Sequence, residues 1–283
     1  MRDYINLRMN YGLYPAPHNL RGIVRYFWNF EYHAGCGLPS EHQAMADGCP
    51  EIIFQYDGGF LENKNYVSYL RAPRSSSKVL HCAERMGMFA IRLYPYAIRQ
   101  LVEIPNSELV NGSFELTHVF GNKYNYVNEQ MLEATSIEAK IKVASDFLST
   151  LWQSSVKDPV DECIRMMLQN EGNVDLDNLR AMTGLSVKQF ERRFKSVAGF
   201  PPKYYSRITR FQATKRKYAT GKFKTLSELS HACDYYDQSH FIREFKEFSG
   251  MQAHHFFKLV GETSEEGKVL RNLVLAKDKP EKI

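Results

Sequence analysis

The stretch of sequence that decides the fold occurs twice. Phe190-Glu-Arg-Arg-Phe194-Lys-Ser-Val-Ala-Gly199 is repeated 51 residues later as Phe241-Ile-Arg-Glu-Phe245-Lys-Glu-Phe-Ser-Gly250, and both follow the form F-x-x-x-F-K-x-x-x-G. Residues four apart lie on one face of a helix, and a glycine commonly ends a helix. The repeat therefore predicts two helices, each with an aromatic face that is buried against the rest of the protein.

The opposite face of each helix carries polar side chains. At 100° per residue, Lys188, Arg192 and Lys195 lie away from the phenylalanines of the first helix. Ser239, Arg243 and Lys246 occupy the equivalent positions of the second helix. These two faces are expected to be exposed and to offer hydrogen-bond donors.

Each of these helices follows a shorter predicted helix and a tight turn, as in a helix-turn-helix. In the first unit, Gly184 suits the turn and Ser186 can cap the second helix; in the second unit, Asp237 is placed as the cap. Residues 203–218 read as one amphipathic helix of roughly 24 Å. Such a spacer suits two recognition helices separated by roughly 34 Å, one turn of the major groove.

The positive charge is concentrated in the second half of the chain. Residues 1–155 hold 14 Lys/Arg and 15 Asp/Glu, whereas residues 156–283 hold 23 and 17. Residues 186–224 contain twelve basic residues and one acid, Glu191. A patch of this kind suits a polyanion, because each neutralised phosphate releases condensed counterions.

This double unit resembles the DNA-binding domain of the AraC/XylS family of bacterial transcription regulators, over about residues 160–256. The most telling stretches are Tyr235-Tyr-Asp-Gln-Ser-His-Phe-Ile-Arg-Glu-Phe-Lys246 and Gly199-Phe-Pro-Pro-Lys203. The resemblance implies that two recognition helices read adjacent major-groove segments of duplex DNA. Carried over to matching positions, the base contacts would come from Lys188, Gln189, Glu191, Arg192, Gln238, Ser239, His240 and Arg243.

The residue chemistry is consistent with this implication. Arginine can bind guanine through two hydrogen bonds, glutamine can pair with adenine, and lysines mostly contact phosphates. Lys195 and Lys246 are therefore expected to be phosphate anchors. The alternative for any one of these residues is a solvated helix position that contacts nothing, and for Glu191 and His240 the two interpretations are equally open.

The sequence departs from the family pattern at several positions. Arg180 and Ser230 stand where a small alanine is usual, and Asp234 replaces a turn glycine. A non-glycine residue at positive φ costs roughly 1 kcal/mol, although Asp tolerates it better than most. Residues 251–253 also lack the usual proline. These departures predict a second unit that is less rigid than the first.

The first half of the chain reads as strands. Runs of aromatic and β-branched residues predict strands at 22–32, 51–56, 66–70 and 88–93, in a small sheet or barrel. After Pro105 the pattern becomes helical. Ser136 is placed to cap a helix that reaches Trp152, with an apolar stripe of Ile137, Ile141, Ala144, Leu148 and Leu151. The stripe could pack on its own sheet or pair with a second subunit, so a homodimer through residues 137–152 remains open.

The expected fold class is α+β, with a β-rich, barrel-like N-terminal domain and trailing helices, followed by an all-α domain with two helix-turn-helix units. The expected boundaries are 1–155 for a ligand-sensing or dimerisation domain, 160–258 for the DNA-binding domain and 261–283 for a polar tail. The polar segment 153–159 ends in proline and is the predicted linker.

Regulators of this kind commonly bind a small molecule in their first domain. Residues 46–54 resemble the D-G-C-x-E-x-I-F stretch of an uncharacterised domain type found ahead of such modules, and Asp47 and Glu51 could hydrogen-bond a ligand. The alternative is a charged turn that enters a buried strand. Tyr26, Trp28 and Phe30 alternate onto one strand face, where they would line a pocket or simply form core.

A metal-dependent, cupin-like enzyme is the competing class. His33, His42, His81 and His118 provide no H-x-H pair, and Cys36 near His33 is the best remaining metal hint. Phosphate-loop and nucleophile-elbow motifs are missing as well. We therefore expect no catalytic residue, metal or cofactor. A non-hydrophobic N-terminus and the lack of a long apolar run predict a cytoplasmic protein with reduced cysteines. The partners would be duplex DNA, a small effector and, for an activator, RNA polymerase.

Overall fold

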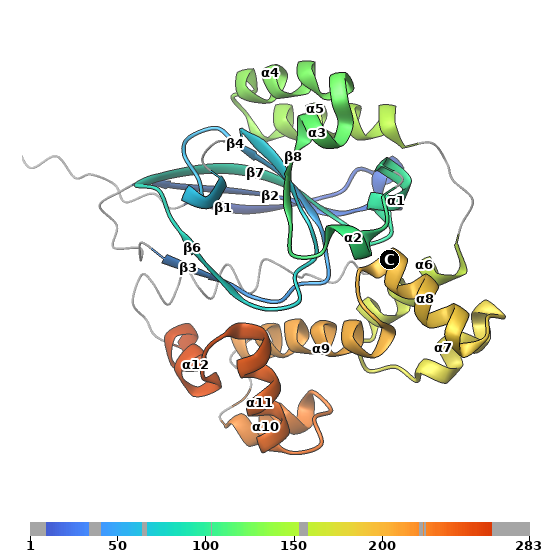
Figure 1. The fold of residues 1–283 in the computed structure, drawn as a ribbon. Coiled ribbons are helices and arrows are strands. Elements are labelled where there is room, and N and C mark those ends of the chain that lie inside the picture. The colour runs from blue at the N-terminus through green and yellow to red at the C-terminus, as the bar shows by residue number, and fades with distance from the viewer. Residues whose placement is uncertain are drawn as a thin grey trace, which may run out of the picture.

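The computed structural model describes residues 10–33, 41–63, 67–102, 104–152, 158–220, 223 and 225–261. Within them the chain forms a β-rich half followed by a helical half, which lies below the sheets in Figure 1. This arrangement confirms the α+β class. The predicted linker residues 153–157 and the predicted tail beyond Gly261 lie outside the described residues.

The larger sheet is antiparallel and has the strand order β1-β2-β7-β4-β5-β8. Its strands are β1 (Asn10–Pro15), β2 (Val24–His33), β4 (Glu51–Gln55), β5 (Ser68–Arg71), β7 (Arg85–Leu93) and β8 (Ser113–Glu115). β3 (Glu41–Ala44) and β6 (Lys78–His81) pair separately. The four predicted strands are β2, β4, β5 and β7. Among the described residues the strands form two open sheets and no single closed barrel.

The β-rich half has an apolar core on each face of the large sheet. Tyr26, Trp28 and Phe30 point to the face that packs toward β3 and β6, whereas Phe27 points to the opposite face. This alternation follows from the two-residue period of a strand. The second face is covered by helices α3 (Leu116–Phe120), α4 (Asn125–Glu133) and α5 (Ile137–Leu151), as Figure 1 shows.

Helix α5 begins at its predicted cap, because Ser136 accepts a hydrogen bond of 3.1 Å from the backbone N–H of Ala139. Ala144 and Leu148 are buried against the chain's own sheet, and Ile141 packs beside them. The sheet therefore occupies the apolar stripe. A second subunit could reach α5 only through its other face.

The prediction that the pattern becomes helical after Pro105 holds for most of residues 106–151 but misses one strand. The short strand β8 lies between α2 and α3 and completes the sheet edge. Helix α1 (Ala97–Val102) lies before Pro105, and α2 (Asn106–Leu109), directly after it, is only one turn long. Short segments have too few residues to show a period, which is why the sequence did not separate them.

The helical half consists of seven helices among the described residues. They are α6 (Pro159–Gln169), α7 (Leu176–Thr183), α8 (Val187–Ala198), α9 (Pro202–Ala219), α10 (Leu226–Ala232), α11 (Gln238–Ser249) and α12 (Ala253–Gly261). The predicted spacer helix is α9. Gly199 and Gly250 end α8 and α11 at φ values of 87° and 76°, a backbone conformation that glycine adopts without a steric cost.

The two halves share part of one core. Ala46, Tyr94 and Tyr96 of the first half are buried in the same apolar cluster as the phenylalanines of α8 and α11. The backbone N–H of Ala46 donates to the carbonyl of Phe248 over 2.9 Å. The buried amide of Asn106 donates to the carbonyl of Val197 over 2.6 Å, at the end of α8. Both recognition-type helices are thus fixed at their C-terminal ends by the β-rich half.

Candidate nucleic-acid interface

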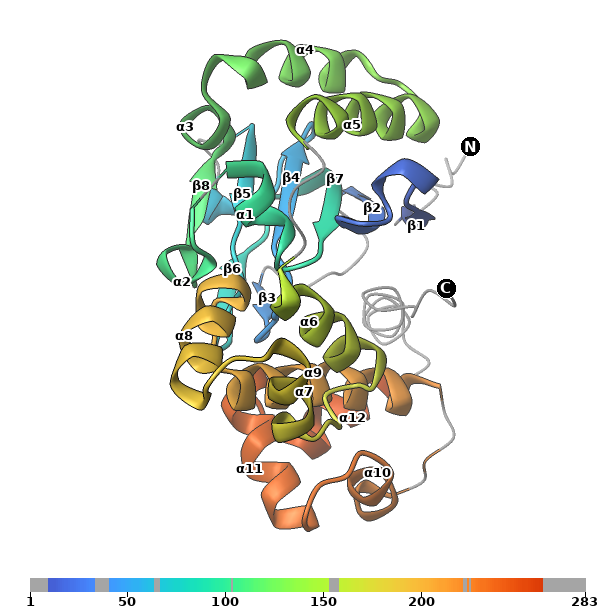
Figure 2. The same ribbon diagram turned by 90° about the vertical axis from the view of Figure 1, so that its right-hand side faces the viewer.

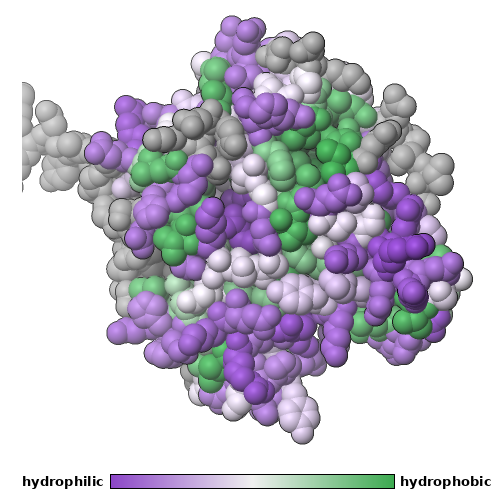
Figure 3. Space-filling view, viewed as in Figure 1, coloured by the Kyte–Doolittle hydropathy of each residue, from purple (hydrophilic) through white to green (hydrophobic). Residues whose placement is uncertain are grey.

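Both repeat helices bury one face and expose the other. In α8, Phe190, Phe194 and Val197 are buried, and Phe241, Phe245 and Phe248 take the same places in α11. Helix α9 lies between the two units, and Figure 2 shows α8 and α11 one below the other along the left side of the helical half. The surface over these helices is rich in hydrophilic residues (Figure 3).

The predicted contact residues of α8 lie on its exposed face. The exposed residues are Lys188, Gln189, Glu191, Arg192 and Lys195. Within the described residues, the Arg192 guanidinium makes no hydrogen bond or ion pair. It is therefore available to an incoming ligand.

Gln189 also takes part in the cap at the start of α8. Its Oε1 accepts hydrogen bonds from the backbone N–H of Ser186 at 3.1 Å and from the Ser186 hydroxyl at 2.9 Å. The Ser186 hydroxyl in turn caps α8 at the N–H of Gln189. This reciprocal pair satisfies groups that a helix start leaves open. It commits the acceptor oxygen of Gln189 to the protein itself.

In α11, Gln238, Ser239, Arg243 and Lys246 are exposed, and Asp237 caps the helix at the N–H of His240 as predicted. Arg243 makes no ion pair or hydrogen bond with any described residue. His240 differs, since it is half-buried with its ring against Tyr235 and its Nε2 3.5 Å from Glu244 Oε2. Its imidazole thus faces the protein more than the other proposed contacts do.

Several basic residues that made the sequence look strongly cationic are ion-paired inside the fold. Arg207 and Arg210 of α9 bind the buried carboxylate of Glu244 in α11, at 2.7 and 3.2 Å. Arg193 binds the buried Asp158 at 2.6 Å. Arg216 and Lys217 both bind Glu171. The acids lie far away in the sequence, so charge counting along residues 186–224 overestimated the exposed positive charge.

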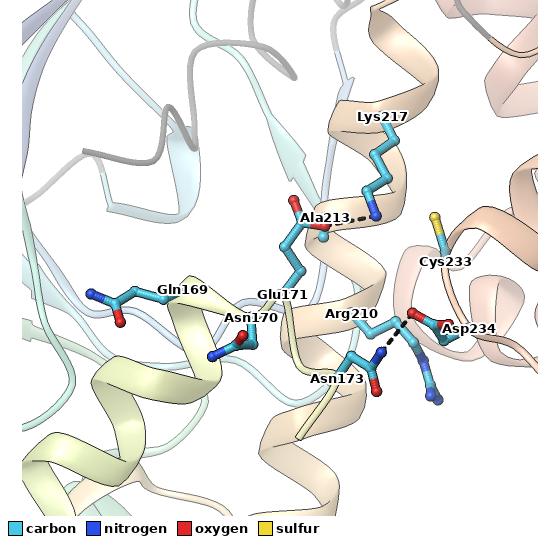
Figure 4. A pocket seen from close by; sticks show the side chains of 9 residues that line it. All are labelled: Gln169, Asn170, Glu171, Asn173, Arg210, Ala213, Lys217, Cys233 and Asp234. Carbon is cyan, nitrogen blue, oxygen red and sulfur yellow. Dashed lines mark hydrogen bonds and ion pairs between the residues drawn. The ribbon is translucent and has the colours of Figure 1, made fainter. Parts of the chain in front are cut away.

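The end of α6 with the segment that follows it, helix α9 and the turn before α11 meet in a pocket of about 240 Å³ (Figure 4). Glu171 binds Lys217 of α9 at 2.7 Å, and Asn173 donates to Asp234, in the turn between α10 and α11, at 2.8 Å. Gly172 approaches α9 so closely that an added Cβ would lie 2.3 Å from the carbonyl oxygen of Ser206. Contacts from three segments therefore fix the orientation of one unit relative to the other.

A helix-turn-helix domain model matches residues 179–259, which contain both units and the spacer helix. The C-terminal domain is an AraC-type helix-turn-helix domain. A second model, described as a domain of unknown function (DUF6597), matches residues 13–115 of the β-rich half. No curated protein matches the sequence significantly.

Two solved structures of ToxT from Vibrio cholerae are distantly similar to this chain. ToxT from strain O395 is 10% identical with a TM-score of 0.44, and the alignment covers 84% of this chain and 99% of that one. ToxT from strain SCE256 bound to an unsaturated fatty acid is 10% identical with a TM-score of 0.43, covering 91% and 97%. These values describe a distant overall likeness only.

The departures of this AraC-type domain from the family pattern are accommodated locally. Arg180 is half-buried, and its guanidinium donates to the carbonyl of Leu185 over 3.4 Å. Ser230 is fully buried and donates to the carbonyl of Ser227 over 2.8 Å. Asp234 does adopt a positive φ, 56°, and its carboxylate accepts the Asn173 hydrogen bond. Helix α12 begins at Ala253 without a proline.

The candidate ligand residues of the β-rich half contact one another and two arginines. Arg92 is fully buried and binds Glu51 Oε1 at 2.8 Å and Asp47 Oδ1 at 2.6 Å. Arg71 pairs with the other oxygen of Glu51, and Trp28 donates its indole N–H to Glu51 over 3.2 Å. The carboxylates of Asp47 and Glu51 therefore balance buried arginines, which agrees with the charged turn that the sequence left open as the alternative. Tyr26, Trp28 and Phe30 are nearly completely buried core residues.

The metal interpretation can be compared only with the described residues. His42 and His81 lie on the paired strands β3 and β6, and no group of three metal-ligating side chains occurs within the described ranges. Cys36 and the side chain of His33 fall outside those ranges. In the part of the chain that the structure describes, no helix combines the length and apolarity needed to cross a bilayer.

Proposed function

We propose that this chain is a sequence-specific DNA-binding transcription regulator that reads two adjacent major-groove segments with α8 and α11. The observation that carries the proposal is the equivalence of Arg192 and Arg243. Both occupy the same position of the repeated motif, and both guanidinium groups are exposed and unpaired within the described residues. The other arginines of the described domain, which are Arg165, Arg180, Arg193, Arg207, Arg210 and Arg216, each form an ion pair with an acid of the chain, so these two stand apart.

The side chains then divide into two roles. Arg192 and Arg243 bind guanine edges bidentately, and Gln238 and Ser239 contact bases in the second segment. Lys188, Lys195 and Lys246 neutralise phosphates and fix the register. Glu191 is exposed on the same face and would select against bases that present only acceptors there. Gln189 supports the start of α8, and the His240 ring packs against Tyr235, so both read bases less than the other residues do.

The direct test is selection of bound duplexes from a random pool, using the full chain. The proposal predicts one asymmetric consensus with two blocks separated by roughly 10 base pairs, within a site of roughly 17 to 20 base pairs. If the departures at Arg180, Ser230 and Asp234 had removed base reading, the chain would be an interaction protein with nonspecific affinity. The pool would then show no enrichment at all.

We infer in addition that residues 1–155 form a sensing domain for a small molecule and residues 160–258 the DNA-binding domain. Support comes from the contacts of Ala46 and Asn106 with the ends of α11 and α8, since a change in the β-rich half would reach both reading helices. A homodimer would have to use surfaces other than the buried stripe of α5. Contact with RNA polymerase is expected only if the chain activates transcription.

A further inference from the structure

The β-rich half contains a cavity of about 230 Å³ beside strands β5 and β6. We call it the arginine pocket. Its polar lining comes from β5, β6 and the segments beside them, namely Glu62, Tyr69, Arg71, Arg74, Lys78, Asn111 and Ser113. Phe60 and Leu80, which belong to the core between the two sheets, also line it. The volume is below the roughly 300 to 1,000 Å³ of drug-sized sites, so it suits a small metabolite.

The charges of the arginine pocket are unbalanced on the side that faces the cavity. Arg71 forms an ion pair with Glu51. Arg74 and Lys78 make no side-chain hydrogen bond or ion pair with any described residue. Glu62 is the one acid of the lining, and its carboxylate already accepts from the backbone N–H and the ring of His81. The pocket thus holds cationic donors that a negatively charged ligand could satisfy.

Burial makes these arginines unusual. Desolvation, followed by repulsion from Arg74, lowers the pKa of Arg71 to about 9. Desolvation also lowers the pKa of Arg74, although Asp47 opposes the effect. A half-buried cation without a hydrogen-bonded partner is costly, and an anion beside it removes part of that cost.

The arginine pocket is joined directly to the DNA-binding domain. The backbones of Arg74 and Asp47 form an antiparallel bridge with hydrogen bonds of 2.7 and 2.8 Å. The neighbouring Ala46 binds the carbonyl of Phe248 in α11 and accepts from the amide of Gln212 in α9. On the other strand of the bridge, the carbonyl of Ser75 accepts from the hydroxyl of Tyr204 over 3.0 Å.

We propose that the arginine pocket binds a small molecule through its carboxylate or phosphate group, and that this binding alters the attachment of α9 and α11. The proposal rests on the proposed regulatory function and specifies its effector as an oxyanion. A guanidinium offers parallel N–H donors that match either group. The ligand would contact Arg74 and Arg71. A shift of the Arg74 backbone would then reach Ala46 through the backbone bridge between Arg74 and Asp47.

The test is thermal unfolding of the full chain in the presence of inorganic phosphate, pyruvate or citrate, at constant ionic strength set with sodium chloride. At least one of these probes is expected to raise the unfolding temperature in a saturable manner, because a ligand bound only to the folded state stabilises it. Which probe acts separates a phosphate ligand from a carboxylate ligand. Arg74→Gln should weaken that binding at least tenfold, and Lys78→Gln should weaken it less.

The matched control is Arg85→Gln, which removes an exposed arginine of the same half from an ion pair with Asp57. It should leave the stabilisation unchanged. Equal stabilisation of wild type and Arg74→Gln, or no saturable stabilisation by any of the probes, would overturn the proposal. Because these measurements contain no DNA, they are independent of the duplex selection. With the selected duplex, the active probe should change DNA affinity in wild type and not in Arg74→Gln.

Discussion

The side-chain amide of Asn173 donates a hydrogen bond of 2.8 Å to the carboxylate of Asp234 and thereby joins the two helix-turn-helix units. Asn173 precedes α7, and Asp234 lies in the turn before α11. The family pattern has a glycine at the second position, which could adopt the required φ but could not accept this bond. With Asp in place of Gly at position 234, the backbone adopts its positive φ less easily, but the side chain gains a contact between the units.

Removing this contact should loosen the second unit. Asp234→Ala is expected to cost about 1 to 2 kcal/mol, since alanine at positive φ is strained and a hydrogen bond contributes about 0.5 to 1.5 kcal/mol. Asn173→Ala should cost less, because it loses only the bond. Urea unfolding measures both. Asp234→Gly loses the hydrogen bond without the strain of alanine at positive φ, so it separates the two contributions. A loss of stability equal to that of Asp234→Ala would contradict the role of backbone strain.

Much of the fold could be predicted because its signals are local and repeated. The aromatic run of β2 and the two F-x-x-x-F motifs repeat often enough to show their period. β3, with the sequence Glu-His-Gln-Ala, has no such pattern, and only its pairing with β6 defines it as a strand. β8 has three residues, so its existence depends on the neighbouring β5 rather than on its own composition.

The candidate site could be predicted less completely, because sequence spacing does not show long-range partners. Arg193 lies next to Arg192 in the sequence, yet it is held by Asp158, 35 residues away. Glu244 on the inner side of α11 neutralises two arginines of α9. The arginine pocket combines residues from separate segments, and no short motif contains it. One available signal was missed, since Ser186 and Gln189 stand three residues apart, as a capping box requires.

Gln189 and Gln238 should respond differently to replacement by alanine. Gln189→Ala removes one half of the α8 cap and is expected to destabilise the protein by about 0.5 to 1 kcal/mol, with little change in base preference. Gln238→Ala leaves stability unchanged and relaxes preference at one position of the site. Paired urea titrations and binding to single-base variants of the duplex measure this contrast. Equal losses of base preference would refute the assignment of Gln189 to the cap.

DNA affinity should fall steeply with salt, but less than the basic composition suggests. Three lysines and two arginines remain on the proposed face, which corresponds to a slope of log affinity against log salt of about −3 to −5. Lys195→Ala should reduce the steepness by about 1, whereas Lys217→Ala, which breaks an internal ion pair with Glu171, should not. Fluorescence anisotropy across a salt series gives these slopes. A slope near zero is incompatible with phosphate contact.

Asp161 should make stability depend on pH. Burial raises its pKa from 3.8 to about 6, against the attraction of Arg99. The folded state therefore holds this proton more tightly than the unfolded state, so the contribution is present below about pH 4 and is lost as pH rises through about 6. Asp161→Asn should be more stable than wild type at pH 7.5, and the difference should vanish toward pH 4.

Thermal unfolding across this pH range measures the difference. Asp146→Asn is the control, because it removes an equivalent carboxylate from an exposed position on α5, 2.6 Å from Lys142. It should produce a smaller change. An advantage of Asp161→Asn that stays constant from pH 4 to 7.5 would show that the buried charge is not its cause.

The most direct measurement is the affinity of Arg192→Ala and Arg243→Ala for the selected duplex and for every single-base variant of it. Each substitution is expected to cost about 1 to 3 kcal/mol and to abolish preference at one guanine, in a different block for each arginine. Arg85→Ala should change nothing. Uniform weakening on all sequences, or loss of preference in the same block, would contradict reading by two separate helices.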